Sequence, residues 1–280
     1  MTFNELYLHM KQLTYDAGYA NPVPYVNMLL KYILNLDRMD ILMNPDQNLS
    51  FEDENKINEA LGKLINGYPI EYITGVSDFM GYELFVGEGV LIPRDDTAAL
   101  VLAANEYIMQ NNNAVVADLC SGSGCISIAI SKKNKNAKIS SVEISDNAFM
   151  YLKHNVEKYN CENVTPICDD IFNFVKYCGD LDLVISNPPY IKRGDLLSLE
   201  KQVAFEPIIA LDGDHDGLFF YRKISDLFYA VLKKGGMIAF EIGYDQFYDV
   251  QNILTKKGYK NIGYRLDESK IKRVIYGYKL

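Results

Sequence analysis

The spacing of apolar residues changes near residue 75, which indicates two differently built parts of the chain. Before that point apolar side chains recur at helical intervals, as at Leu29, Leu30 and Ile33. Prolines at positions 22 and 45 interrupt the pattern and separate the helices from one another. We therefore predict a small helical domain over residues 1–74.

Between residues 76 and 92 the apolar residues alternate with polar ones, which is the period of a strand. Gly81, Gly87 and Gly89 interrupt this stretch, and Pro93 ends it. The pattern predicts a β-hairpin linker over residues 75–94.

From residue 95 to the end the chain alternates short apolar runs with amphipathic segments. Strands are expected at 114–119, 138–143, 164–168, 181–186, 236–242, 261–266 and 271–278. Helices are expected at 96–110, 124–132, 146–159, 216–233 and 245–257. Such alternation predicts an α/β fold with a parallel, doubly wound sheet. No helix separates the last two strands, so they should pair in antiparallel fashion. Seven strands with that edge predict a Rossmann-like class I methyltransferase domain over residues 95–280.

Composition narrows the class of protein. A net charge of −9 argues against a protein that coats nucleic acid, so we expect no stable nucleic-acid binding. No apolar run approaches the roughly 20 residues of a membrane helix, and no secretion signal opens the chain. Five cysteines without paired spacing and three scattered histidines predict no metal site. We expect a cytoplasmic protein, monomeric and not bound to a membrane.

The tetrapeptide Asn187-Pro188-Pro189-Tyr190 is the most informative chemical feature. It follows an apolar strand, and two successive prolines must end that strand because they cannot donate to a sheet. The corner therefore lies at the carboxyl end of a strand, where open α/β sheets bind ligands. An asparagine oxygen and a proline carbonyl can both accept hydrogen bonds from one planar NH2 group, against which Tyr190 can lie flat. This suits an enzyme that alkylates an amide or an aromatic amine.

Three further segments predict a site for adenosine without phosphates. The segment from Asp118 to Gly124 is a strand followed by a glycine-containing turn and a helix start, and Ser127 replaces the third glycine of a dinucleotide-binding loop. Glu143 ends the next strand, where a carboxylate can accept both ribose hydroxyls. Asp170 follows the third strand and can bind the adenine amine, while Ile171 packs on the ring. S-adenosylmethionine fits this description. The cofactor-binding residues are therefore predicted to be Asp118, Cys120, Ser121, Gly122, Ser123, Gly124, Glu143, Asp170, Ile171 and Asn187.

With these motifs in place, the chain resembles the release factor glutamine methyltransferases, the PrmC or HemK family, over nearly its whole length. Segments 69–75, 91–97 and 118–125 are similar to the family's conserved stretches, and Asn187 to Tyr190 matches its catalytic motif. Cys120 stands where the family loop has glycine, and Ala98 stands in place of a glutamate.

The resemblance implies a reaction and a partner. The acceptor would be the side-chain amide nitrogen of the glutamine in the Gly-Gly-Gln motif of peptide chain release factors. Asn187 and the Pro188 carbonyl would accept its two hydrogens, with Pro189, Tyr190 and Phe85 shaping the substrate slot. Arg94, Thr97 and Glu206 are further candidates in matching segments, and the helical domain would position the release factor.

Two other classes of function remain open at this point. The same corner could methylate an exocyclic amine of adenine or guanine in a nucleic acid, with the base flipped onto Tyr190. A module that binds cofactor or a partner without turnover is the second alternative, against which the intact Asn187 and Tyr190 argue.

Overall fold

The computed structural model describes all 280 residues, which form two compact units. The smaller unit contains Met1–Val76 and a short segment from far along the chain, Glu200–Phe205. The larger contains Ser77–Leu199 and Glu206–Leu280. The hairpin thus groups with the larger unit, and Glu200–Phe205 groups with the helices. No helix in the structure has the length and apolar character needed to cross a bilayer.

The smaller unit is a bundle of short helices around one apolar core. Its helices are α1 (Phe3–Asp16), α2 (Val23–Leu34), α3 (Arg38–Met43), α4 (Phe51–Ile65) and α5 (Ile70–Thr74). Leu6, Leu29 and Leu64 are fully buried where these helices meet. Side chains of Thr2 and Ser50 accept hydrogen bonds from the first turns of α1 and α4, which fixes where both helices begin.

The segment Glu200–Phe205 closes against this bundle. The Gln202 amide donates to the Tyr19 hydroxyl at 3.2 Å, and that hydroxyl donates to the Leu64 carbonyl at 2.9 Å. The Phe205 ring meets the Tyr68 ring edge-on, with centroids 5.0 Å apart.

The larger unit opens with the hairpin of β1 (Val76–Phe79) and β2 (Tyr82–Phe85). Met80 and Gly81 form its two-residue turn with φ of 54° and 81°. Two positive φ values are what a tight hairpin turn of this hand requires, and glycine supplies the second without steric cost.

A seven-stranded sheet forms the centre of the larger unit. Its strands are β3 (Val115–Leu119), β4 (Lys138–Glu143), β5 (Val164–Cys168), β6 (Leu181–Ser186), β7 (Leu232–Glu241), β8 (Lys260–Leu266) and β9 (Lys272–Tyr278). They lie in the order β5-β4-β3-β6-β7-β9-β8, with β9 antiparallel to both β7 and β8. The predicted seven-stranded sheet with its antiparallel edge is confirmed.

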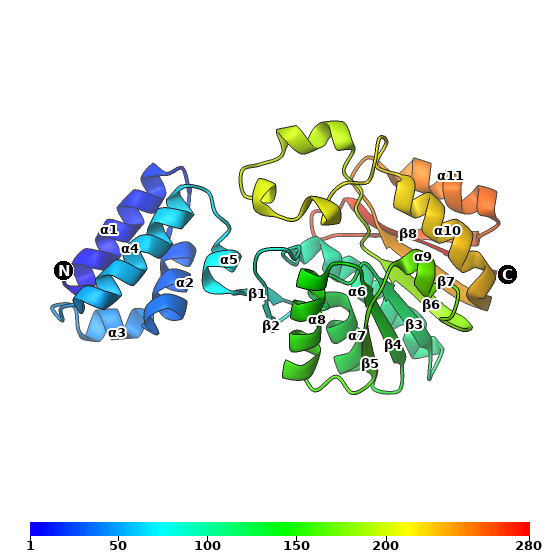
Figure 1. Ribbon diagram of the computed structural model, residues 1–280, viewed down its shortest axis with the longest axis horizontal. Helices are drawn as coiled ribbons and strands as arrows, with labels where there is room; N and C mark the ends of the chain where they lie inside the picture. The colour runs from blue at the N-terminus through cyan, green and yellow to red at the C-terminus, as the bar shows by residue number, and fades with distance from the viewer. The chain divides into compact units, whose positions relative to one another are not determined.

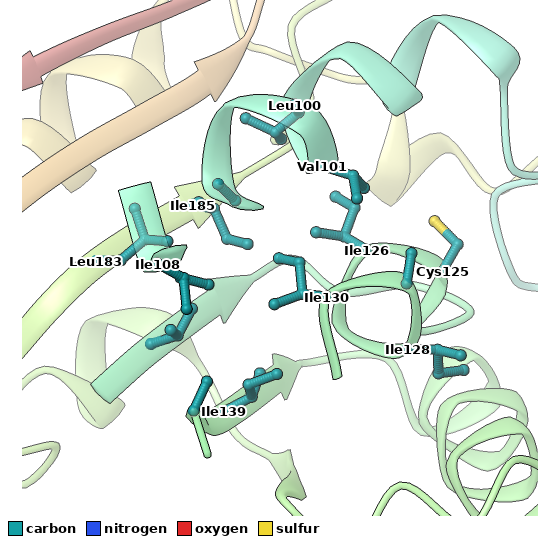
Figure 2. Close-up of a cluster of buried hydrophobic side chains, with 14 of the residues drawn as sticks. Leu100, Val101, Ile108, Cys125, Ile126, Ile128, Ile130, Ile139, Leu183 and Ile185 are labelled. Atoms are coloured by element: carbon teal, nitrogen blue, oxygen red, sulfur yellow. The ribbon is translucent and has the colours of Figure 1, made fainter. Parts of the chain in front are cut away.

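Helices cover both faces of this sheet (Figure 1). On one face lie α6 (Ala98–Gln110), α7 (Cys125–Lys133) and α8 (Asp146–Lys158). On the other lie α9 (Ile171–Phe174), α10 (Phe219–Val231) and α11 (Phe247–Lys257). Figure 2 shows the first of these cores, where Leu100 and Ile126 from the helices point toward Ile185 on the sheet.

Element boundaries differ from the predicted ones where local hydrogen bonds intervene. The helix expected from residue 96 begins with a 3-10 turn, η1 (Asp95–Thr97), before α6. The helix expected from residue 216 begins at Phe219 because the Asp216 carboxylate accepts the Leu218 N–H and Gly217 has φ of 73°. Short helices η2 (Arg193–Ser198), η3 (Val203–Phe205) and η4 (Ile208–Ala210) fill the connection after β6.

Candidate active site

A cavity lies at the edge of the sheet formed by the carboxyl ends of β3, β4 and β6. The predicted site residues that line it are Arg94, Thr97, Cys120, Ser121, Gly122, Ser123, Glu143, Asp170, Ile171, Asn187 and Pro189. Asp118, Gly124, Pro188, Tyr190 and Glu206 lie outside its lining, and so does Phe85. Residues from five segments of the sequence therefore meet around one space.

The turn after β3 brings backbone close to the cavity. Cys120 has φ of 59° and Gly122 has φ of 54°, so the chain turns through left-handed conformations on the cavity wall. A non-glycine residue in that region is strained, and such strain concentrates at functional sites. The Ser121 N–H donates to the Val142 carbonyl at 3.0 Å, which fixes this turn to the neighbouring strand.

Asp118 supports the turn from beneath. Its side chain is fully buried, and its Oδ2 accepts a hydrogen bond of 2.6 Å from Ser127, whose hydroxyl also meets that of Ser141. Its Oδ1 has no partner. Burial raises the pKa of Asp118 to about 7. The sequence analysis noted Ser127 only because it replaces a glycine of the dinucleotide-binding loop. The structure shows that it is a hydrogen-bond donor to Asp118.

Glu143 presents a carboxylate to the cavity while held by backbone. Its Oε2 accepts the Gly122 N–H and its Oε1 accepts the Ser145 N–H, both at 2.8 Å. Each oxygen can accept a further hydrogen bond, so the two can still receive the two hydroxyls of a ribose. Burial raises the pKa of Glu143, while these backbone donors oppose the rise.

Asp170 both caps a helix and lines the cavity. Its Oδ1 caps α9 by accepting the Phe172 N–H at 2.8 Å, and the residue also lines the cavity. Ile171 is buried beside it, and Ile144, Phe172 and Phe220 add apolar walls that the sequence analysis did not name. The part of the cavity beside Asp170 is therefore lined by apolar side chains, with one carboxylate at its edge.

The Asn-Pro-Pro-Tyr corner directly follows β6. Pro188 is buried, Asn187 is half-buried, and the Asn187 Nδ2 donates to the Thr97 hydroxyl at 3.4 Å. The Tyr190 carbonyl accepts the Gln246 amide at 2.9 Å, and burial raises the pKa of the Tyr190 phenol to about 12. A Cβ on Gly213 would lie 2.7 Å from the Tyr190 Cα, so only glycine permits this close approach.

Arg94 and Glu206 form an ion pair beside the cavity. Glu206 is buried, and its carboxylate accepts hydrogen bonds from the Arg94 guanidinium and, at 3.0 Å, from the Ile92 N–H. Arg94 lies on the cavity wall. This pair joins the segment before η1 to the segment before η4, residues 112 positions apart.

Phe85 lies apart from this cavity. Its ring packs edge-on against His154 with centroids 4.3 Å apart, and Lys158 Nζ lies 4.4 Å from the ring centroid. Asn155 fixes the backbone of Phe85 through both its N–H and its carbonyl. The structure therefore gives Phe85 contacts on α8 and does not place it with Asn187.

Comparison with known proteins identifies the family. The PrmC N-terminal domain family matches residues 5–75, and the methyltransferase small domain family matches residues 94–205. A release factor glutamine methyltransferase of Clostridium acetobutylicum is 38% identical over 251 residues, covering 89% of this chain and 88% of the relative. One of Bacillus cereus is 36% identical over 233 residues, covering 82% of each.

The chain belongs to the release factor glutamine methyltransferase family. The resemblance seen in the sequence is thereby confirmed, and the chain is a methyltransferase.

Solved structures match this release factor glutamine methyltransferase family member at the level of fold. The catalytic domain of hMettl16 in complex with the MAT2A 3'UTR hairpin 6 superposes with a TM-score of 0.58 at 14% identity, covering 71% of this chain and 76% of that one. SMU.776 complexed with SAH superposes with a TM-score of 0.51 at 17% identity, covering 73% of this chain and 55% of that one. Both support the Rossmann-like fold of the methyltransferase domain.

Proposed function

We propose that this enzyme transfers a methyl group from S-adenosylmethionine to the side-chain amide nitrogen of the glutamine in the Gly-Gly-Gln motif of peptide chain release factors. One observation carries the proposal beyond family membership: Asn187 and Pro189 line the same cavity as Glu143 and Asp170. The residues proposed to bind the amide and those proposed to bind adenosine thus line one cavity. Direct transfer of a methyl group between two bound molecules requires this arrangement.

The residues present fit the cofactor. Glu143 can accept hydrogen bonds from ribose hydroxyls, because each of its carboxylate oxygens has a lone pair left after binding backbone. The Asp170 carboxylate can likewise accept from an amine. Ile144, Ile171 and Phe172 offer apolar surface to an adenine ring. Arg94 is the only lysine or arginine in the lining, and Glu206 neutralises its charge, so the cavity offers no free cation to a phosphate group. When bound, S-adenosylmethionine supplies a methyl group on a positively charged sulfur, which needs no further activation.

The corner would act by orientation and polarisation. Asn187 Oδ1 and the Pro188 carbonyl accept the two amide hydrogens of the glutamine, which draws the nitrogen lone pair out of conjugation with its own carbonyl. Pro189 and Tyr190 keep this corner rigid, because proline fixes φ and Gln246 holds the Tyr190 carbonyl. Alignment of the nitrogen in a site that excludes water can contribute several kcal/mol to lowering the barrier.

The helical domain would position the folded release factor. Three of the six residues of α3, Met39, Leu42 and Met43, are more than half exposed despite being apolar, as binding surfaces often are. Substituting all three with serine should raise KM for the folded release factor and leave KM for a short Gly-Gly-Gln peptide unchanged. Equal effects on both substrates would contradict a positioning role.

The enzyme would act in the cytoplasm, since its substrate is a component of translation. We also expect it to act as a monomer. Size-exclusion chromatography with light scattering tests the monomer, for which a mass near 31.8 kDa is expected. A mass of twice that value would contradict it.

Mass spectrometry of a purified release factor after incubation with enzyme and S-adenosylmethionine tests the function directly. A gain of one methyl group on the Gly-Gly-Gln glutamine is expected, and none on a release factor whose glutamine is replaced by glutamate. Transfer to total RNA or DNA instead would favour the nucleic-acid alternative, and no transfer to any of these would favour a binding module.

A further inference from the structure

A second acidic residue, Glu241, lies behind the amide-binding corner. It is the last residue of β7, and β6 runs parallel to β7 with Ser186 opposite Phe240. Asn187 directly follows Ser186, and Glu241 directly follows Phe240. The two residues therefore lie side by side at the same edge of the sheet. Glu241 does not line the cavity, whereas Asn187 does.

The Glu241 carboxylate is poorly satisfied for a buried charge. The residue is 2% exposed, and its Oε2 has no hydrogen-bond partner. Burying a carboxylate without full hydrogen bonding is unfavourable, so such a group normally persists only where it serves another purpose.

The neighbouring Arg273 guanidinium forms no ion pair with the Glu241 carboxylate. The Arg273 guanidinium is shared between Asp96 at 3.0 Å, Asp267 at 3.1 Å and the Ile242 carbonyl at 3.3 Å. Tyr221 donates its hydroxyl to the backbone carbonyl of Glu241 at 2.9 Å and leaves the carboxylate untouched. Burial raises the pKa of the Glu241 carboxyl, and the neighbouring side chains of Thr97 and Asn187 oppose that rise.

Thr97 completes a small polar cluster with these two residues. It is 2% exposed, it lines the cavity, and its hydroxyl accepts the Asn187 Nδ2 at 3.4 Å. A hydroxyl that accepts from an amide still has its own hydrogen to donate, and the buried carboxylate beside it is the acceptor available.

An asparagine amide has a donating end and an accepting end, and the proposed reaction needs the accepting end toward the glutamine. A carboxylate can only accept hydrogen bonds, so turning the Asn187 oxygen toward Glu241 would place oxygen against oxygen. With Nδ2 turned toward Thr97 and Glu241, Oδ1 is left for the substrate.

We propose that Glu241, acting with Thr97, is a positioning residue that fixes the orientation of the Asn187 amide and so sets up Oδ1 to accept a hydrogen from the methyl-accepting glutamine. This inference rests on the proposed function of the Asn187 corner. It explains why a carboxylate with one unsatisfied oxygen is kept in the core at a strand end next to Asn187.

A double-mutant cycle between Glu241 and Asn187 tests this role. Glu241→Gln keeps the shape of the side chain but can both donate and accept, so it allows either amide orientation. Its kcat for release factor methylation should fall by about ten- to a hundredfold, with cofactor Kd and release factor KM within about twofold of wild type. In an Asn187→Ala background, measured under single turnover, the same change should alter the rate by less than about twofold. Independent, multiplicative effects would overturn the proposal, as would a wild-type kcat for Glu241→Gln.

Two controls separate positioning from folding. Asp267→Asn changes another buried carboxylate beside Arg273 that does not contact Asn187, and it should lower the melting temperature while leaving kcat unchanged. Glu241→Gln should not lower the melting temperature at pH 8, because it removes a buried charge. A fall in melting temperature for Glu241→Gln as large as that for Asp267→Asn would point to a merely structural role.

One readout does not depend on activity, so failure here can be told from failure of the proposed function. In 15N spectra the Asn187 side-chain amide pair is identified as the pair absent from Asn187→Ala. Its exchange with solvent should be slowed in wild type and faster in Glu241→Gln and in Thr97→Val, with Thr97→Ser close to wild type. Unchanged exchange in Glu241→Gln would overturn the proposal even if release factor methylation is confirmed.

Discussion

Two strand ends carry buried glutamates, and the protein treats them in opposite ways. Glu143 ends β4 and has a backbone N–H on each carboxylate oxygen. Glu241 ends β7, has one oxygen without a partner, and depends on the side chains of Thr97 and Asn187. On the proposed assignment, the cofactor side of the cavity is therefore fixed by backbone, while the acceptor side is fixed by side chains.

The difference teaches where sequence changes should separate binding from chemistry. A carboxylate held by backbone donors is part of the turn, so its loss should disturb both the turn and the ligand. A cluster held by side chains can change its chemistry while the backbone stays in place. Substitutions at the two ends should thus affect different measured quantities.

The largest effect is expected at Asn187. Asn187→Ala removes the amide proposed to accept the glutamine hydrogen, and kcat should fall by about a thousandfold, as for loss of one key polar group in other enzymes. Cofactor Kd, measured by calorimetry, should stay within about threefold because Glu143 and its backbone donors are untouched. A large rise in cofactor Kd with little change in kcat would reverse the assignment of the two ends.

Glu143→Ala should show the opposite pattern. It removes the proposed ribose acceptor and leaves the Gly122 and Ser145 N–H groups unpaired, so cofactor Kd should rise by about a hundredfold and the free energy of unfolding should fall by about 2 kcal/mol. Calorimetry and urea unfolding measure the two. Glu143→Asp is the matched control, since it keeps the charge and should restore most of the affinity. If Glu143→Ala lowered kcat alone, the cofactor side would not be where the structure suggests.

The pH dependence of stability should distinguish Glu241→Gln from wild type. Burial raises the pKa of Glu241 to about 7, above its ordinary value of 4.5, so between these values the folded protein keeps a proton that the unfolded chain has lost. Wild type should therefore lose stability relative to Glu241→Gln as pH rises from about 4.5 to about 7, by about 3 kcal/mol, with little further change above that. Urea midpoints of both proteins at several pH values give the difference, in which the contribution of Asp118 and other shared groups cancels. A difference that shrinks with rising pH would contradict a buried, raised carboxylate.

The sequence could predict the sheet, and it could name Glu143 and Asp170, which line the cavity, because both results depend on short segments. Alternation of apolar runs with amphipathic helices determined the strand count, and Glu143 and Asp170 each follow a strand that can be recognised in isolation. The contact of Phe85 with His154 could not be predicted, because which face of a hairpin meets α8 depends on packing between residues far apart in the sequence.

Glu241 and the Glu200–Phe205 segment escaped prediction for a related reason. No local motif marks Glu241, and only the pairing of β6 with β7 brings it next to Asn187. Glu200–Phe205 has no distinctive motif, and its place in the helical unit rests on contacts with Tyr19 and Tyr68, more than 130 positions away. Long-range packing decides such contacts, and a local pattern cannot show them.

The smallest effect is expected at Asp170, which shares features of both ends. One of its oxygens caps α9 through the Phe172 N–H, so Asp170→Ala should lower the free energy of unfolding by about 1 kcal/mol. Asp170→Asn keeps one oxygen for the cap and should leave stability near wild type. Its second side-chain atom is then a nitrogen, which cannot accept a hydrogen bond from an adenine amine as the second carboxylate oxygen can. Cofactor Kd should therefore rise by about tenfold in Asp170→Ala and by less in Asp170→Asn, as measured by calorimetry alongside urea unfolding. If Asp170→Ala lowered stability and left cofactor Kd unchanged, Asp170 would be a helix cap alone, and the adenine end of the cavity would depend on Ile171 and its apolar neighbours without a polar contact from this residue.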